Sequence, residues 1–159
     1  MEKKLGVVDV QTLPVVAGFN WSVGFMMERF IKALAKKEFL AARCQACNYT
    51  YVPPRWRCGR CHGVIEEKDL VPLSGKGTLM SYTTAYVALD GNGNFVDLPE
   101  PVLIGAVRFD GADSTMFLPL EGISPKKVKE GLRVRLQWRE QTKGEPADIS
   151  SVVPASGKG

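Results

Sequence analysis

The chain has 159 residues, of which 45% are hydrophobic and 24% charged, and its formal net charge is +4. This composition is typical of a water-soluble globular protein, and no apolar run approaches the roughly 20 residues needed to cross a bilayer. Residues 1–63 carry 10 basic and 4 acidic groups, whereas residues 64–159 carry 11 and 13. A nucleic-acid reader built on the C-terminal part would need its basic residues there, so the charge distribution disfavours that class.

Residues 1–21 lack helical periodicity and contain Gly6, Pro14 and Gly18, so we expect an N-terminal arm. Asp9 and Pro14 interrupt any core of a signal peptide, and we therefore expect a cytoplasmic protein with reduced thiols.

Apolar residues then recur at helical spacing from Val23 to Leu34. This pattern predicts an amphipathic helix over residues 22–43. Trp21 and Phe25 fall on the opposite side of that helix. Such a helix can simply pack on the rest of the chain, or its aromatic side can meet another protein, and Trp21 and Phe25 are the candidate partner contacts.

All four cysteines lie in CQACNYTYVPPRWRCGRCHG, as two CxxC pairs separated by ten residues. Thiolate sulfur suits Zn²⁺ in tetrahedral geometry, and four cysteines complete the coordination shell, which makes the metal structural. A thioredoxin-like redox site would instead need one CxxC at the start of a helix. We predict a zinc ribbon over residues 44–65 with the ligands Cys44, Cys47, Cys58 and Cys61. The only histidine, His62, is expected to face solvent because the shell is already full.

Arg55, Trp56 and Arg57 follow two prolines between the cysteine pairs. They form either a solvated basic turn with Trp56 packed underneath, or a binding site for an anion and a ring. Arginine holds phosphate bidentately and an indole stacks on a base. Phosphate plus adenine describes both nucleic acid and coenzyme A, so this segment alone leaves both ligands open.

The remainder is rich in Thr, Tyr and Val and predicts five strands, near residues 75–89, 102–110, 115–120, 132–140 and 147–154. A helical turn capped by Ser124 is expected between the third and fourth strands. This order is typical of a five-stranded OB-fold barrel, which we place at residues 66–154, followed by a disordered tail at 155–159. The segment 90–101 is predicted to be a long functional or mobile loop. The predicted fold class is thus mainly β with an N-terminal helix.

The sequence contains no GxSxG, HExxH or Walker motif, and its cysteines are assigned to metal. We therefore expect no catalysis by this chain alone.

The succession FIKALAKKEFLAARC, CQAC, PPRWRCGRC, SGKGTLMSYT and GLRVRLQW resembles the family labelled "domain of unknown function 35" over residues 22–155. Residues 1–21 precede the usual core of that family. The resemblance implies a rubredoxin-like zinc ribbon whose four cysteine ligands match those predicted here, joined to an OB fold.

Members of that family accompany thiolase-superfamily proteins: acetoacetyl-CoA thiolase and HMG-CoA synthase in archaea, aldolases of steroid side-chain breakdown, and the benzoylsuccinyl-CoA thiolase of toluene degradation. The partner holds the catalytic residues, and the ribbon–OB subunit helps to bind acyl-CoA. The resemblance therefore implies an accessory subunit that binds coenzyme A or acyl-CoA in a hetero-oligomer. Arg55, Trp56 and Arg57 are the candidate CoA contacts from their chemistry alone. A single-stranded nucleic-acid-binding module and a scaffold without a ligand are the alternatives.

Overall fold

The computed structural model describes residues 22–155. The predicted N-terminal segment 1–21, which includes Trp21, and the predicted tail beyond residue 155 lie outside the described residues. One helix is described, α1 (Phe25–Leu34). The described strands are β1 (Phe39–Arg43), β2 (Thr50–Tyr51), β3 (Leu70–Leu73), β4 (Lys76–Leu89), β5 (Phe95–Phe109), β6 (Thr115–Pro119), β7 (Arg133–Trp138) and β8 (Ile149–Pro154). Short 3-10 turns are η1 (Glu67–Asp69), η2 (Pro125–Lys127) and η3 (Pro146–Asp148).

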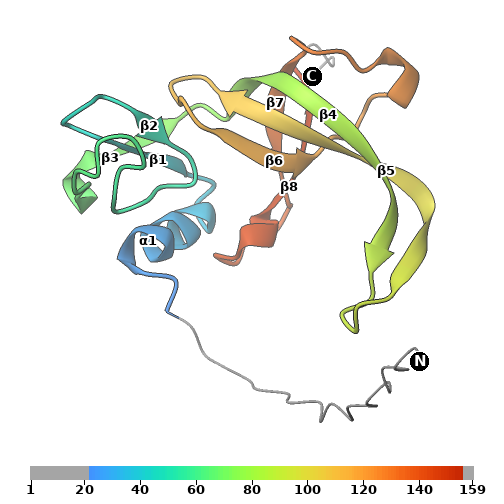
Figure 1. Cartoon of the computed structure of the whole chain (residues 1–159), viewed down its shortest axis with the longest axis horizontal. Coiled ribbons are helices and arrows are strands. Elements are labelled where there is room, and N and C mark those ends of the chain that lie inside the picture. Colours follow the sequence, from blue (N-terminus) through green and yellow to red (C-terminus); the bar gives the residue numbers. More distant parts are fainter. Residues whose placement is uncertain (1–21, 156–159) are drawn as a thin grey trace, which may run out of the picture.

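The strands form two antiparallel sheets (Figure 1). The small sheet has the order β2-β1-β3, and the larger has the order β6-β5-β4-β7-β8. A parallel bridge from Leu120 to Val152, with the Glu121 N–H donating to the Val152 carbonyl at 2.9 Å, joins the end of β6 to β8 and closes the larger sheet. The first barrel strand lies between the second and fourth, and the third meets the fifth in parallel, which confirms the predicted OB fold.

The predicted helix over residues 22–43 is too long. α1 ends at Leu34, the Lys37 N–H donates to the Leu34 carbonyl at 2.8 Å, and Lys37 adopts a φ of 59° that turns the chain. Residues Phe39–Arg43 then form the central strand of the small sheet, paired with β3 from Phe39 to Ala42. This pairing buries Phe39 and Ala41, so burial in the tertiary structure outweighs the local helical preference of the segment.

The predicted loop at 90–101 is also wrong, because only Asp90–Asn94 form a turn. From Phe95 onward the chain returns along β4, with Leu89 opposite Phe95. Pro99 and Pro101 obscured this strand in the sequence. A proline is tolerated on an edge strand, and β5 meets β6 only from Ile104 to Arg108. The result is a long two-stranded hairpin that leaves the barrel (Figure 1).

The helix, the small sheet and the barrel share one hydrophobic core. Phe39 of β1 packs edge-on against Phe109 of β5, with ring centroids 4.7 Å apart and an interplanar angle of 67°. The ring of Phe30 of α1 also lies next to that of Phe39, with ring centroids 6.0 Å apart. These three aromatic side chains hold α1 and the small sheet, which together carry the cysteine turns, against the barrel. Among residues 22–155, no helix has the length and apolar character needed to span a membrane.

Candidate metal centre and the adjoining groove

The two CxxC pairs sit in two turns of the same geometry. The Asn48 N–H donates to the Cys44 carbonyl at 2.7 Å, and the Cys44 N–H donates to the Tyr49 carbonyl at 2.9 Å. In the second turn, His62 N–H donates to the Cys58 carbonyl at 3.1 Å, and Cys58 N–H donates to the Gly63 carbonyl at 2.9 Å. Asn48 and His62 adopt φ angles of 59° and 60°, which close each turn. Both turns thereby direct their cysteines toward the same point.

The four sulfur atoms lie within 4.8 Å of one another. The Sγ atoms of Cys44 and Cys61 are 3.5 Å apart, as are those of Cys47 and Cys58. These distances exclude disulfides, whose sulfurs are about 2.05 Å apart. They approach the separation of about 3.8 Å that follows from tetrahedral coordination with Zn–S bonds of about 2.3 Å. The cluster can therefore bind one metal ion such as zinc.

The ionisation of the thiols supports the same conclusion. Cys58 Sγ lies 3.4 Å from the Tyr51 hydroxyl and accepts the Arg60 N–H at 3.4 Å. The Tyr51 contact is the largest cause that lowers the pKa of Cys58 to about 5. The Tyr49 N–H acts to lower the pKa of Cys47, but burial and the neighbouring cysteine sulfurs outweigh it and raise this pKa to about 12. Cys58 thus ionises readily, whereas Cys47 resists ionisation unless a cation lies nearby.

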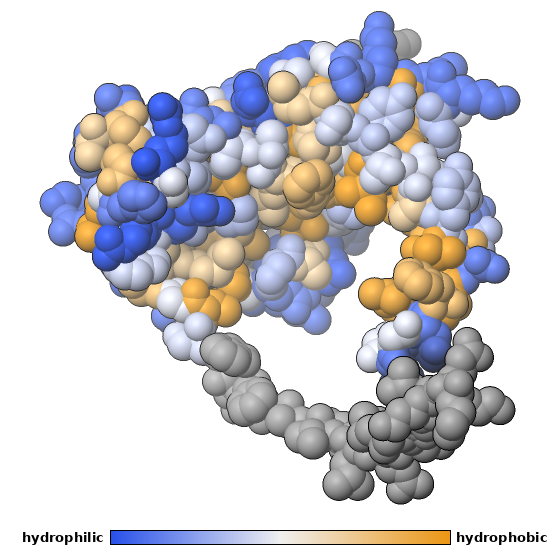
Figure 2. All heavy atoms as spheres, in the orientation of Figure 1, coloured by the Kyte–Doolittle hydropathy of each residue, from blue (hydrophilic) through white to orange (hydrophobic). Residues whose placement is uncertain are grey.

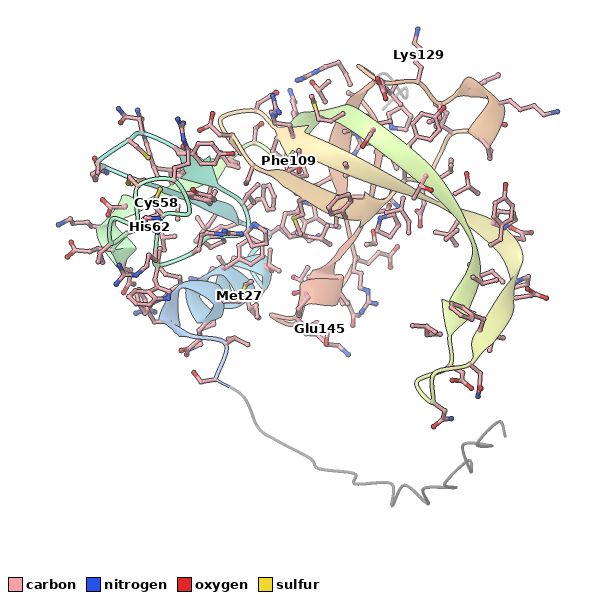
Figure 3. All side chains as sticks on the ribbon, in the orientation of Figure 1. Met27, Cys58, His62, Phe109, Lys129 and Glu145 are labelled. Carbon is pink, nitrogen blue, oxygen red and sulfur yellow. The ribbon has the colours of Figure 1, made fainter. Side chains whose placement is uncertain are left out.

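Tyr51 is a residue that the sequence interpretation missed. Its hydroxyl accepts the Gly59 N–H at 2.9 Å, which directs its own proton toward Cys58. Burial and the contact with Cys58 raise the pKa of Tyr51, so the hydroxyl stays protonated. Tyr49 packs on it with ring centroids 4.6 Å apart. The sequence offered one signal for this role, the two tyrosines that follow the first CxxC pair. His62 is exposed, as predicted; Figure 3 labels it beside Cys58.

A groove of about 520 Å³ lies between the start of α1 and the loop that precedes the second CxxC pair. The helix contributes Phe25 and Met27 and the loop contributes Pro53, Arg55 and Trp56. Figure 3 labels Met27 on α1, the helix that forms this wall. Trp56 is 53% exposed and Phe25 48% exposed, so large aromatic surfaces remain open in a groove with mainly apolar walls.

The structure separates the three candidate CoA contacts. Arg55 and Trp56 line the groove together with Phe25, which the sequence had placed in a different role. Arg57 does not line it: its guanidinium lies over the Trp56 ring, 4.8 Å from the ring centroid, and donates to the His62 carbonyl at 2.9 Å. Arg57 therefore supports Trp56. The other candidate partner contact, Trp21, lies outside the described residues.

Comparison with known proteins gives the same fold. Residues 70–139 match the family model described as "ChsH2, C-terminal OB-fold domain". A crystal structure of a DUF35-family protein of unknown function from Sulfolobus solfataricus is 28% identical, with 69% of this chain and 75% of that chain covered and a TM-score of 0.53.

A structure described as "Ltp2-ChsH2(DUF35) aldolase" covers 86% of this chain and 99% of the matched chain, with a TM-score of 0.59. Its 22% identity supports a shared fold. No curated protein matches the chain. The four-cysteine ribbon, the barrel topology and these matches agree with the expected family. Residues 70–139 match an OB fold of the ChsH2 type, and the matches together support a DUF35 domain in this chain.

Proposed function

We propose that this chain is a non-catalytic subunit of a thiolase-superfamily enzyme of thiolase, HMG-CoA synthase or aldolase type. In this proposal its groove holds the coenzyme A part of the acyl-CoA substrate. The assignment of coenzyme A as the ligand rests on one observation: Arg55, Trp56 and Phe25 line the same groove next to the cysteine cluster. The partner would supply the nucleophile and the acid–base groups.

The metal in this proposal is zinc, held by Cys44, Cys47, Cys58 and Cys61. Four thiolates complete the coordination of Zn²⁺, so the ion would have a structural and not a catalytic role. The groove loop lies between the two ligand turns. Metal binding would therefore hold Arg55 and Trp56 against the start of α1.

Coenzyme A combines an adenine ring, phosphates and a long, less polar arm. The Trp56 indole offers a stacking surface, and Arg55 offers a cation beside it. The guanidinium of Arg55 lies over Tyr51, 4.9 Å from the ring centroid, which holds the cation in place at the groove. The walls formed by Met27 and Pro53 suit the less polar part of the ligand.

The matched structure described as an Ltp2-ChsH2(DUF35) aldolase supports a partner of this class, since a DUF35 domain is combined there with an aldolase. Co-expression with a thiolase-superfamily protein encoded beside this chain tests that part of the proposal. We expect a stable heteromer whose turnover of acyl-CoA collapses when this chain is omitted. A partner that never co-purifies and is fully active alone would contradict the proposal.

Calorimetry with coenzyme A, on the chain alone and on the heteromer, tests the ligand. Trp56→Ala and Arg55→Ala should each weaken binding roughly 10-fold, because each removes one recognition contact. Arg60→Ala is the matched control, since Arg60 lies over Tyr49 as Arg55 lies over Tyr51 but does not line the groove. Equal losses in all three variants, or no binding of coenzyme A by the heteromer, would contradict the site.

The same material tests the nucleic-acid alternative. Binding of single-stranded oligonucleotides with a steep loss of affinity on adding salt would favour that function over the one proposed here. The acidic balance of residues 64–159 argues against it.

A further inference from the structure

The hairpin of β4 and β5 extends well beyond the barrel. β4 pairs with β7 only from Lys76 to Thr78, and β5 pairs with β6 only from Ile104 to Arg108. We call residues 80–103 the arm (Figure 1). Residues 81–83 pair with the part of β5 that also pairs with β6, whereas from Thr84 to Val102 the arm is two-stranded, with no third strand among the described residues. Two-stranded ribbons are marginally stable in water unless another element covers them.

The arm is unusually apolar for an exposed pair of strands. It carries eight of the thirteen large exposed hydrophobic side chains found in residues 22–155. Phe95 is 77% exposed and Leu89 65% exposed, and Figure 2 shows hydrophobic side chains gathered toward the end of the arm. The eight are Met80, Tyr82, Tyr86, Val87, Leu89, Phe95, Val96 and Val102. A patch of this kind marks an interaction surface in a soluble protein.

Both faces of the arm are apolar. Leu89 pairs with Phe95, so these two side chains share one face. Ala88 pairs with Val96, and because successive residues of a strand alternate, this pair lies on the opposite face. Contact with a flat surface would leave one of these faces in water. A cleft that encloses the arm would cover both.

The turn at the end of the arm is closed by its own hydrogen bonds. The Asp90 carboxylate accepts the Asn92 N–H at 2.7 Å and the Asn94 side-chain amide at 2.9 Å. Gly91 and Gly93 supply the positive φ angles of 84° and 93° that this turn requires. Binding therefore costs little ordering of the turn, which favours insertion as a preformed unit.

Charge and edge chemistry define what the arm can enter. Asp90, Asp97 and Glu100 give the arm a net charge of −3, and residues 80–103 contain no basic residue. Two arms of neighbouring copies would repel each other, whereas a cleft with basic groups at its rim would attract the arm.

The two edges of the arm differ. Pro99, Pro101 and the acidic residues protect the outer edge of β5 from pairing with another strand. The outer edge of β4 over residues 80–89 has no proline or charge.

We propose that the arm is the element that docks this chain onto its thiolase-superfamily partner, by insertion into an apolar cleft with a basic rim. This inference rests on the proposed function for the identity of the partner. The surface itself is defined by the exposure, two-sided hydrophobicity and charge of residues 80–103.

The test measures binding of the purified partner to the full chain and to the double variant Leu89→Asp with Phe95→Asp. We expect roughly 100-fold weaker binding, because two carboxylates replace apolar side chains in the cleft. The matched control is Phe117→Asp, since Phe117 is 71% exposed on β6 but lies outside the arm. Zinc content and circular dichroism report whether each variant is folded, and we expect both to match the wild type.

A second variant, Asp97→Asn with Glu100→Gln, separates charge from apolar contact. It should slow association and reduce the salt dependence of the rate, with a smaller effect on dissociation. A wild-type chain that binds no partner overturns the proposed function together with this inference. A wild-type heteromer that the arm variants join equally well overturns the inference alone, as does an isolated chain that self-associates through the arm.

Discussion

Asp113 and Thr50 connect the barrel to the ribbon. Asp113 lies in the turn between β5 and β6, and its carboxylate accepts the Thr50 N–H at 2.8 Å while its own N–H donates to the Thr50 carbonyl at 2.9 Å. The next residue, Ser114, repeats the exchange with Val52, accepting its N–H at 2.8 Å and donating to its carbonyl at 3.0 Å. The barrel turn thus binds the backbone of Thr50 and Val52, mainly through side chains, and orients the cysteine-bearing small sheet.

Asp113→Ala should loosen this connection. The substitution leaves the Thr50 N–H without its side-chain acceptor, and we expect a loss of about 1–2 kcal/mol in the free energy of unfolding. Hydrogen exchange should rise at Thr50 and Val52 more than in the barrel. Asp97→Ala, an exposed aspartate on the arm, is the control and should leave both measurements unchanged. Equal exchange in the two variants would show that the ribbon is oriented by other contacts.

The metal centre is tested by ligand substitution. Cys44→Ser and Cys58→Ser should each abolish stoichiometric zinc, because three thiolates leave the coordination shell open. His62→Ala should retain one zinc per chain, since His62 is exposed and stands outside the sulfur cluster. Elemental analysis and the charge-transfer absorption of the cobalt-substituted protein give the measurement. Full zinc retention in Cys58→Ser would exclude the four-sulfur site.

Acid should release this metal. Thiols must lose their protons to bind zinc, so affinity falls as the pH is lowered. The Tyr51 contact that lowers the pKa of Cys58 to about 5 should extend binding to lower pH. Tyr51→Phe removes the hydroxyl, so zinc release monitored with a chelating dye should begin at a higher pH than in the wild type. An unchanged release curve would mean that Tyr51 only packs.

Phe109 joins the two parts of the core. It is 1% exposed and packs against Phe39 of β1, so Phe109→Ala would leave a cavity between the small sheet and the barrel. We expect a loss of about 3–5 kcal/mol in the free energy of unfolding, measured by urea titration. Phe117→Ala, at an exposed position of β6, should change it by less than about 0.5 kcal/mol. Similar losses at both positions would contradict the shared core.

Asp148 makes stability depend on pH in the acidic range. The side chain is buried, and although burial alone would raise its pKa, the N–H groups of Lys143, Glu145 and Gly144 outweigh this and lower it. A folded-state pKa below that of the unfolded chain contributes stability at higher pH, and this stability is lost as the pH falls through the folded value. Asp148→Asn should therefore be less stable than the wild type at about pH 7, with the difference shrinking below about pH 4.

Any loss of zinc in acid would affect the wild type and Asp148→Asn alike, so the difference between their urea midpoints isolates the carboxylate. A difference that stays constant between about pH 7 and about pH 3 would show that Asp148 does not titrate with folding.

Local chemistry explains what could be predicted from the sequence. Two CxxC pairs at this spacing place four sulfurs around one point through the geometry of two short turns, so the cysteine cluster was predicted without knowledge of the rest of the fold. The five barrel strands and the 3-10 turn at Pro125–Lys127 follow from alternation and turn residues, which act over a few neighbours.

Contacts between distant segments decided the rest. Residues 39–43 have the apolar character of a helix continuation, and they form a strand because β3, some thirty residues later, offers a pairing that buries Phe39. The return of β5 along β4 turned an expected loop into the arm. Phe25 and Trp56 share a groove only because α1 packs beside the ribbon. Periodicity and spacing report the geometry of near neighbours along the chain, whereas the groove and the arm depend on which distant surfaces bury each other and which stay exposed.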